Sequence, residues 1–338
     1  TNNTIKNVGL FDLTPFSKFE IKSDKAHQEL QKICTANIKN EPGKCVYTHM
    51  LNSDGGIETD LTVVCVDKNN FRIISSAATR ERDKFHIKKH LSKNIELKDI
   101  TDDLCVFGLF GPKSRDLLKT LSEDNFENDQ FRFGFAKFIT IDGVKIWTQR
   151  LSYVGELGYE LYVDLKDAKK IYELLIEKGK DFNLSNCGMH AMDIMRMESG
   201  FLHWGHDISP EENQYQAGLA FTISNKKDVD FIGKQALEKI KQDKVKTRFS
   251  MFTLKESEPG KPLLLHDEPI YDGEKIIGRS TSGNYSFNFK KNLVFGYINN
   301  DLSNEELQNK NLFIEVEKKK YPIESISKPL KQTNFKNN

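Results

Sequence analysis

The sequence lacks the features that mark several large classes of protein. It has no apolar run of membrane-spanning length, and its 50 Lys and Arg residues are balanced by 49 Asp and Glu residues. The missing apolar run argues against a transmembrane helix, and the missing basic excess gives no reason to expect a nucleic-acid partner. The first residues, TNNTIKNVGLFD, show no signal-peptide pattern. We therefore expect a cytoplasmic protein with neither a membrane nor a nucleic acid as partner.

Motifs for metals and dinucleotides are also missing. There is no Cys-x-x-Cys, no His-Glu-x-x-His and no Gly-x-Gly-x-x-Gly after a predicted strand. The histidine pairs His86/His90 and His203/His206 lack nearby ligands of the right kind, so we predict no metal site. The five cysteines are odd in number, widely spaced and mostly set in apolar runs. This pattern is typical of reduced thiols.

With 338 residues, of which 38% are hydrophobic, the chain suits two or three packed domains. Apolar periodicity predicts strands at residues 16–22, 57–66, 71–76, 104–110, 136–140 and 144–150. The first of these alternates like a strand with one exposed face. Helical spacing predicts helices at residues 23–34, 79–91, 113–123, 166–179, 186–198 and 234–242.

The pattern changes at about Asp243, where short strands separated by turns begin and predict a small β-barrel or sandwich. The last ten residues, from Pro329, have the composition of a disordered tail. We therefore expect a first domain at 1–242, a barrel at 243–328 and a tail at 329–338.

Two acidic residues stand out because they lie on or beside apolar strands. Glu160 is flanked by Tyr159 and Tyr162, and Glu is seldom buried unless it is paired. It therefore meets either a structural donor, the commoner case, or the N–H edge of a heterocyclic ligand, which can donate two parallel hydrogen bonds. Asp60 follows a Gly-Gly turn. Its carboxylate either bonds neighbouring backbone amides or accepts a proton near a reacting nitrogen.

Eight phrases, in order along the chain from residue 8 to residue 283, carry a family resemblance that extends to about residue 330. The chain resembles the aminomethyltransferase of the glycine cleavage system, and is still more similar to the folate-binding C-terminal part of dimethylglycine and sarcosine dehydrogenases. The phrases are VGLFDLTPFSKFEIK, HMLNSDGGIETDLTV, SAATRERD, GLFGPKSRDLL, RLSYVGELGYELYV, AMDIMRMESGFLHWGHDI, DFIGKQAL and GRSTSG.

The resemblance implies an α+β fold in which three subdomains form a cloverleaf around tetrahydrofolate, the last being a small C-terminal β-barrel. Residues 1–242 would then hold two folate-binding subdomains. Asp60 matches the family's catalytic acid, and Glu160 matches the Glu that binds the pterin. Tyr153 matches the Tyr of a Tyr-Thr-Gly-Glu motif in which Val154 here replaces the Thr. The implied cofactor-binding residues are Asp60, Leu61, Thr62, Tyr153, Glu160, Leu161 and Tyr162.

One departure from the glycine-cleavage enzymes points to the dehydrogenase branch: Met192 stands where those enzymes carry an Arg. The resemblance thus implies one-carbon transfer from a dimethylglycine- or sarcosine-like amine, giving 5,10-methylenetetrahydrofolate. The implied partners are a small methylated amine and an FAD-containing dehydrogenase module or chain.

Two alternatives remain open. Relatives on this fold demethylate sulfur or oxygen compounds with the same cofactor. Others are folate-binding assembly factors for iron-sulfur proteins, but their Lys-Gly-Cys-Tyr-x-Gly-Gln-Glu signature is not reproduced at residues 43–47.

Overall fold

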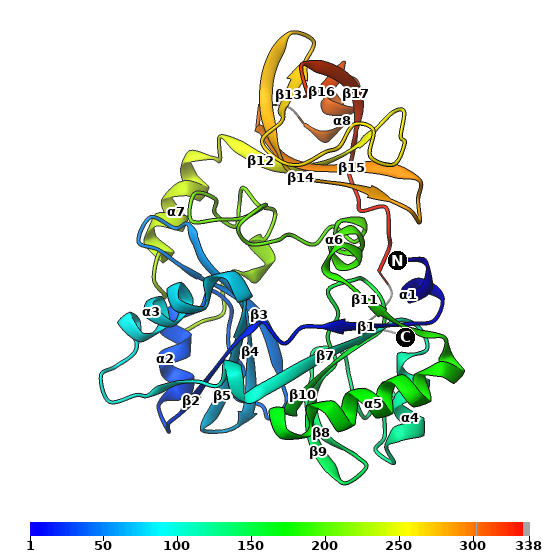
Figure 1. Cartoon of the computed structure of the whole chain (residues 1–338). Coiled ribbons are helices and arrows are strands. Elements are labelled where there is room, and N and C mark those ends of the chain that lie inside the picture. Colours follow the sequence, from blue (N-terminus) through cyan, green and yellow to red (C-terminus); the bar gives the residue numbers. More distant parts are fainter. Residues whose placement is uncertain (302, 334–338) are drawn as a thin grey trace.

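Two β-sheets and a closed β-barrel meet around the middle of the molecule (Figure 1). The computed structural model describes residues 1–301 and 303–333. The barrel lies at the top of the view, above the two sheets, and α6 (Met189–Glu198) lies near the junction of all three.

The five-stranded sheet is built from one contiguous stretch of chain and is antiparallel throughout, in the order β3-β4-β5-β2-β6. Its strands are β2 (Ser17–Lys22), β3 (Cys45–Leu51), β4 (Ile57–Asp67), β5 (Asn70–Ser75) and β6 (Leu97–Asp99). Helices α2 (Ala26–Ile33) and α3 (Arg80–His90) pack on one face. Because side chains alternate along a strand, Leu61 and Val63 of β4 join this helix-covered core.

The six-stranded sheet has the order β11-β1-β7-β10-β9-β8. Its strands are β1 (Val8–Asp12), β7 (Leu104–Phe110), β8 (Ala136–Ile141), β9 (Val144–Gln149), β10 (Gly158–Asp164) and β11 (Leu184–Cys187). Strand β1 is parallel to β11 and antiparallel to β7. Helices α4 (Ser114–Leu121) and α5 (Ala168–Gly179) cover one face, where Leu161 of β10 is buried.

The opposite faces of the two sheets share a third core. Cys45 and Val64 of the five-stranded sheet pack in one cluster with Trp147 and Tyr162 of the six-stranded sheet and with Met192 of α6. Residues two apart on a strand point to the same face. Asp60, which precedes Val64 by four residues, and Glu160, which precedes Tyr162 by two, therefore point from opposite sheets toward this shared core.

The remaining strands form the closed antiparallel barrel, in the order β12-β15-β14-β13-β16-β17, which confirms the fold expected after residue 243. They are β12 (Thr247–Leu254), β13 (Pro269–Asp272), β14 (Lys275–Ser286), β15 (Lys291–Asn299), β16 (Leu312–Val316) and β17 (Lys319–Ile326). Helix α7 (Lys234–Asp243) precedes the barrel, so the expected boundary after residue 242 falls at the end of this helix.

Short helical elements complete the fold. They are α1 (Asn2–Lys6), α8 (Asn304–Gln308), η1 (Ala77–Thr79), η2 (Thr101–Asp103), η3 (Leu165–Asp167), η4 (Lys180–Phe182) and η5 (Ala220–Thr222). All five cysteines are free thiols. Within the described part of the chain, the helices are too short or too polar to cross a membrane.

Three local expectations differ from the structure. Strand β2 is buried on both faces except at Lys22, because the Lys18 ammonium donates to the Thr14 carbonyl at 2.8 Å and Glu20 is paired with Lys22. Strand β3 was not expected at all. Residues 184–187 form strand β11 beside β1, so α6 begins only at Met189.

Residues 329–333, expected within a disordered tail, make ordered contacts. The Lys331 amide donates to the Glu198 carbonyl at 2.8 Å, its ammonium pairs with Glu156, and Leu330 packs on a hydrophobic cluster. Residues 334–338 lie outside the described residues.

Candidate active site

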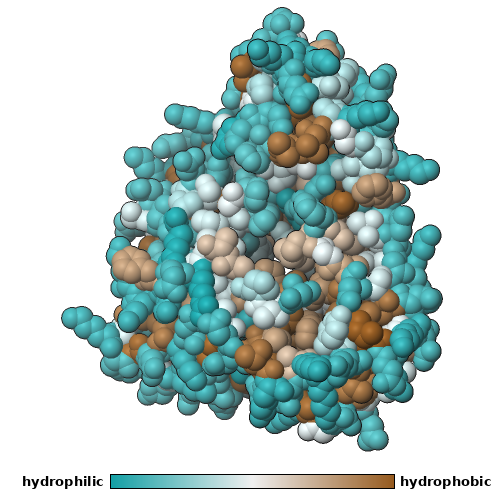
Figure 2. Space-filling view, in the orientation of Figure 1, coloured by the Kyte–Doolittle hydropathy of each residue, from teal (hydrophilic) through white to brown (hydrophobic). Residues whose placement is uncertain are grey.

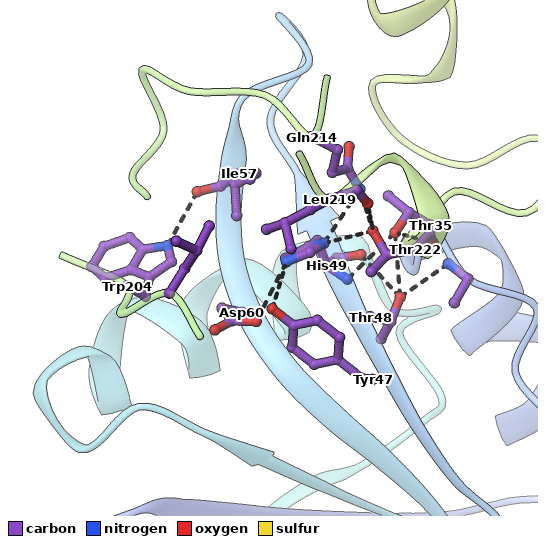
Figure 3. Close-up of polar contacts among 12 residues, drawn as sticks. Thr35, Tyr47, Thr48, His49, Ile57, Asp60, Trp204, Gln214, Leu219 and Thr222 are labelled. Carbon is purple, nitrogen blue, oxygen red and sulfur yellow. Dashed lines mark hydrogen bonds and ion pairs between the residues drawn. The ribbon is translucent and has the colours of Figure 1, made fainter. Parts of the chain in front are cut away.

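Asp60 lies on β4 directly opposite His49 on β3 (Figure 3). The His49 Nε2 atom is 3.4 Å from Asp60 Oδ1 and 3.2 Å from the Tyr47 hydroxyl. His49 is wholly buried, whereas the Asp60 side chain is 19% exposed. The Asp60 carboxylate is therefore held by β3 at its back while part of its surface stays open.

The second ring nitrogen of His49, Nδ1, also has hydrogen-bond partners. Its Nδ1 is 3.0 Å from the hydroxyl of Thr222 in η5, and the amide nitrogen of Gln214 lies 3.4 Å from both. The Thr222 hydroxyl donates to the Leu219 carbonyl at 2.7 Å. A buried polar chain therefore runs from Asp60 through His49 to the backbone of η5.

Glu160 lies on β10 of the other sheet and has a different environment. The Tyr162 hydroxyl donates to Glu160 Oε2 at 2.9 Å. Burial raises the pKa of Glu160 to about 7, and the Tyr162 hydrogen bond only partly offsets that effect. Burial raises the pKa of the Cys45 thiol, and the charge of Glu160 raises it further. Glu160 therefore lies close to Cys45, on β3 of the facing sheet. The structure thus contains a partly buried carboxylate that accepts a hydrogen bond from a neutral phenol.

Gln149 lies beside Glu160 across the β9–β10 ladder. Its side chain is wholly buried, and neither its amide oxygen nor its amide nitrogen has a hydrogen-bond partner. Cross-strand neighbours point to the same face. A carboxylate and an unsatisfied amide therefore stand next to each other, which suits a ligand that offers both N–H donors and a carbonyl acceptor.

Tyr153 forms a third wall, in the loop between β9 and β10. Its hydroxyl donates to the Leu202 carbonyl at 2.5 Å, and its ring stacks on Phe201 with centroids 5.9 Å apart. Burial raises the pKa of Tyr153, and the charge of Asp60 raises it further. The Asp60 charge acts on Tyr47 in the same way, so Tyr153 and Tyr47 flank the acid. Figure 2 shows the molecular face hollowed near its middle, below the barrel.

The structure divides the predicted site residues into two groups. Asp60 and Thr62 share one face of β4, and Glu160 and Tyr162 share one face of β10. The side chains of Leu61 and Leu161 are buried on the opposite faces, in the helix-covered cores. Only the backbone of these two leucines is available on the side of the acids.

Sequence reasoning missed His49, Tyr47 and Gln149. A signal for the first two was present, because Tyr47 and His49 are two residues apart before the Asn52–Gly56 turn, the spacing of one strand face. For Gln149 we find no such signal, since its environment depends on the pairing of β9 with β10.

Comparisons with known proteins give a consistent result. Residues 1–227 match the family model described as the GCVT N-terminal domain, and residues 248–331 match the glycine cleavage T-protein C-terminal barrel domain. An aminomethyltransferase of Alkaliphilus metalliredigens is 31% identical over 98% of this chain and 88% of its own length.

Longer relatives match as well. The 4-methylaminobutanoate oxidase (formaldehyde-forming) of Paenarthrobacter nicotinovorans is 37% identical over 83% of this chain and 34% of its own length. The mitochondrial dimethylglycine dehydrogenase of Rattus norvegicus is 33% identical over 96% of this chain and 38% of its own length. The chain spans about a third of the length of these two relatives.

Among solved structures, the glycine cleavage system aminomethyltransferase T from Bartonella henselae superposes with a TM-score of 0.85. The match covers 98% of this chain and 88% of that chain at 20% sequence identity. The two proteins share a fold, which confirms the expected α+β architecture with a C-terminal barrel.

Proposed function

The chain belongs to the glycine cleavage T-protein family, and on that premise we propose that it transfers a one-carbon unit from a methylated amine to tetrahydrofolate. The observation that carries the proposal is Glu160, a partly buried carboxyl whose pKa is raised to about 7 and which accepts a hydrogen bond from a neutral phenol. Such a group is satisfied by N–H donors of a ligand.

The residues fit the pterin ring of tetrahydrofolate. Its amino-pyrimidinone edge has two adjacent N–H donors, which suit Glu160, and a carbonyl oxygen, which suits the amide of the unsatisfied Gln149. Tyr153, Tyr162 and Thr62 supply the surrounding walls in this proposal. When bound, tetrahydrofolate supplies a nucleophilic amine nitrogen that takes up the one-carbon unit.

Asp60 is assigned to the chemistry. Its partly exposed carboxylate accepts a proton at Oδ from an attacking amine and stabilises positive charge on an iminium carbon. The surrounding aromatic and aliphatic side chains exclude water, which would otherwise hydrolyse an iminium to formaldehyde. Binding and proton transfer therefore fall to acids on two different sheets.

The substrate class follows from the relatives. Two of them are named as an oxidase of 4-methylaminobutanoate and a dehydrogenase of dimethylglycine, both N-methyl amines. We infer a dimethylglycine- or sarcosine-like donor whose oxidation is carried out by an FAD-containing module or partner chain. The product is 5,10-methylenetetrahydrofolate.

The test combines the chain, tetrahydrofolate and candidate N-methyl amines, with and without a flavin-dependent dehydrogenase. Mass spectrometry then identifies the folate product. We expect 5,10-methylenetetrahydrofolate to form faster with the chain than without it, and only when the dehydrogenase is present. The Asp60→Asn variant is the matched control, because it keeps the side-chain volume.

Two outcomes would contradict the proposal. Formation of 5-methyltetrahydrofolate from a methylated sulfur or oxygen compound would assign the chain to demethylation of that class. A folate product that forms at the same rate with wild type, with Asp60→Asn and without protein would remove the catalytic assignment altogether.

A further inference from the structure

We propose that His49 is a positioning residue whose Nε2 atom is the acceptor for the proton that Asp60 takes up. This inference rests on the proposed function for its purpose, but not for its geometry. His49 is wholly buried, so it acts on a substrate only through Asp60.

The hydroxyl of Thr222 fixes which ring nitrogen of His49 carries hydrogen. A threonine hydroxyl has one proton to donate, and that of Thr222 points to the Leu219 carbonyl, 2.7 Å away. The hydroxyl oxygen also lies 3.0 Å from His49 Nδ1. Because its proton is already donated to Leu219, the oxygen can only accept here, so Nδ1 is the donor. The ring accordingly carries its hydrogen on Nδ1.

This tautomer determines the hydrogen-bonding role of Nε2. In a neutral ring that is protonated at Nδ1, Nε2 is an acceptor, and it faces the Asp60 carboxylate at 3.4 Å. In the resting site the Tyr47 hydroxyl, 3.2 Å from Nε2, is the donor available to this nitrogen, and Asp60 Oδ1 has no hydrogen-bond partner among the described residues. Once Asp60 is protonated, its O–H can donate to Nε2.

The groups around this pair are few. Tyr47 on the same strand places its hydroxyl 3.2 Å from Nε2, and the Asp60 charge also acts on Tyr153. The segment that packs on the other side of the ring contributes Gln214 and Thr222, which carry no charge.

The pair has a use in the reaction. When Asp60 takes a proton from an amine nitrogen, the N–H bond breaks and an O–H bond forms. Transfer of that proton from Asp60 Oδ1 to His49 Nε2 restores the carboxylate and leaves an imidazolium, whose Nδ1–H remains bonded to Thr222. No other reactant is consumed, and Asp60 again carries the charge that stabilises a cationic carbon.

The geometric part is tested on the full chain without any ligand, by ¹⁵N nuclear magnetic resonance of its histidines. The His49 signals are assigned by comparison with His49→Gln. We expect the Nδ1–H tautomer in the neutral ring. A neutral ring protonated at Nε2 would overturn the proposal.

The functional part uses the folate assay. His49→Gln keeps a polar side chain but cannot take up the proton. We expect about a tenfold loss of kcat, a KM for tetrahydrofolate within about twofold of wild type, and a shifted pH profile of kcat. Thermal unfolding checks that the variant is folded. The matched control is His27→Gln on α2, a histidine bonded to the Ile38 carbonyl, which should leave all three values unchanged.

The two proposals fail in different ways. If the wild-type chain gives no folate product, the proposed function fails while the tautomer still decides whether His49 Nε2 can accept a proton from Asp60. If the wild type is active and His49→Gln keeps its kcat and pH profile, the role of His49 fails and the folate function stands.

Discussion

Asp60 and Glu160 are both carboxylic acids on central strands, and their surroundings differ in a way that suits the different roles proposed for them. Asp60 is partly exposed and faces an imidazole, whereas Glu160 faces a neutral phenol and is raised in pKa to about 7 by burial. Two carboxyl groups in different environments can serve different roles in one site, one as a proton acceptor and the other as a binding group.

Replacing Asp60 by Asn removes the proton acceptor with little change in shape. We expect folate-dependent turnover to fall by about a hundredfold, because general base catalysis commonly contributes that much. Tetrahydrofolate affinity should survive. Steady-state kinetics and calorimetric titration measure the two effects separately, and unchanged turnover would refute the assignment.

Replacing Glu160 by Ala should act on binding instead. The loss of two charge-assisted hydrogen bonds to the ligand predicts a decrease in binding free energy of about 2–4 kcal/mol. Isothermal titration calorimetry with tetrahydrofolate measures it. Glu173→Ala, which removes an exposed acid on α5, is the matched control and should bind tetrahydrofolate normally. Normal affinity in Glu160→Ala would contradict the pterin assignment.

The raised pKa of Glu160 also predicts how binding depends on pH. A folded-state pKa above the usual value means that ionisation costs folding stability, so this contribution declines as pH rises from about 4.5 to about 7. Donors on a ligand favour the ionised form. Affinity should therefore rise over the same range, with proton release on binding below about pH 7.

Calorimetry in two buffers of different ionisation enthalpy counts the released protons. The Glu160→Gln variant, which cannot ionise, should bind with the same affinity across this range. A wild-type affinity that does not change with pH, and no proton release, would show that Glu160 does not bind as a carboxylate.

The sequence identified both acids because each interrupts an apolar strand pattern, a signal that belongs to single residues. It did not identify His49 or Gln149. Their importance depends on what stands opposite them, Asp60 and Glu160 respectively, and cross-strand register is not visible in the local pattern.

At the scale of elements, α6 and the loop that follows it share a buried ion pair that is hydrogen-bonded to β14 of the barrel. The Arg196 guanidinium contacts Asp207 at 2.5 Å and donates to the Ser282 hydroxyl of β14 at 2.8 Å. Both charged side chains are almost fully buried. Removing Arg196 leaves the Asp207 carboxylate with hydrogen bonds from Thr281, Ser282 and the His203 amide but without its cation, which is costly in a low-dielectric interior.

We therefore expect Arg196→Met to lower the free energy of unfolding by about 3–5 kcal/mol. Arg279→Met is the matched comparison, because Arg279 pairs with Asp267 on the barrel surface with both side chains about half exposed. That change should cost less than about 1 kcal/mol. Urea denaturation measures both free energies of unfolding. Equal losses would show that the buried pair contributes no more to stability than the exposed pair.

Elements were predicted best where a single face is buried. The hairpin of β4 and β5, the strands β7 to β9 and the closed barrel agree with the apolar periodicity. Strand β2 was misinterpreted because Lys18 and Glu20 are buried with their own polar partners, so polar residues no longer mark the solvent face. Strand β3 was missed because its polar Tyr47 and His49 belong to the site.

At the scale of the whole molecule, residues 329–333 run from the barrel back to the sheets. Lys331 pairs with Glu156, in the loop that also carries Tyr153, and both side chains are mostly buried. Burial raises the pKa of Glu156, and Lys331 counteracts this effect. The composition of this segment predicted a tail without structure. Composition does not reveal a tertiary ion pair such as this one.

Lys331→Met should therefore lower the free energy of unfolding by about 1–3 kcal/mol, since it leaves the Glu156 carboxylate desolvated without its cation. The nearby Lys328 is exposed, and Lys328→Met should change stability by less than about 0.5 kcal/mol. Chemical denaturation of the two variants is the measurement. Equal stabilities would show that this contact does not hold the molecule together.

The position of β1 has a consequence for biosynthesis. Residues 8–12 lie between β7 and β11, so the six-stranded sheet cannot be completed until residue 187 has been translated. The five-stranded sheet needs only residues 17–99. A nascent chain therefore reaches the ribosome exit with β1 unpaired while the sheet that carries Asp60 is already able to fold, and the wall that carries Glu160 forms later.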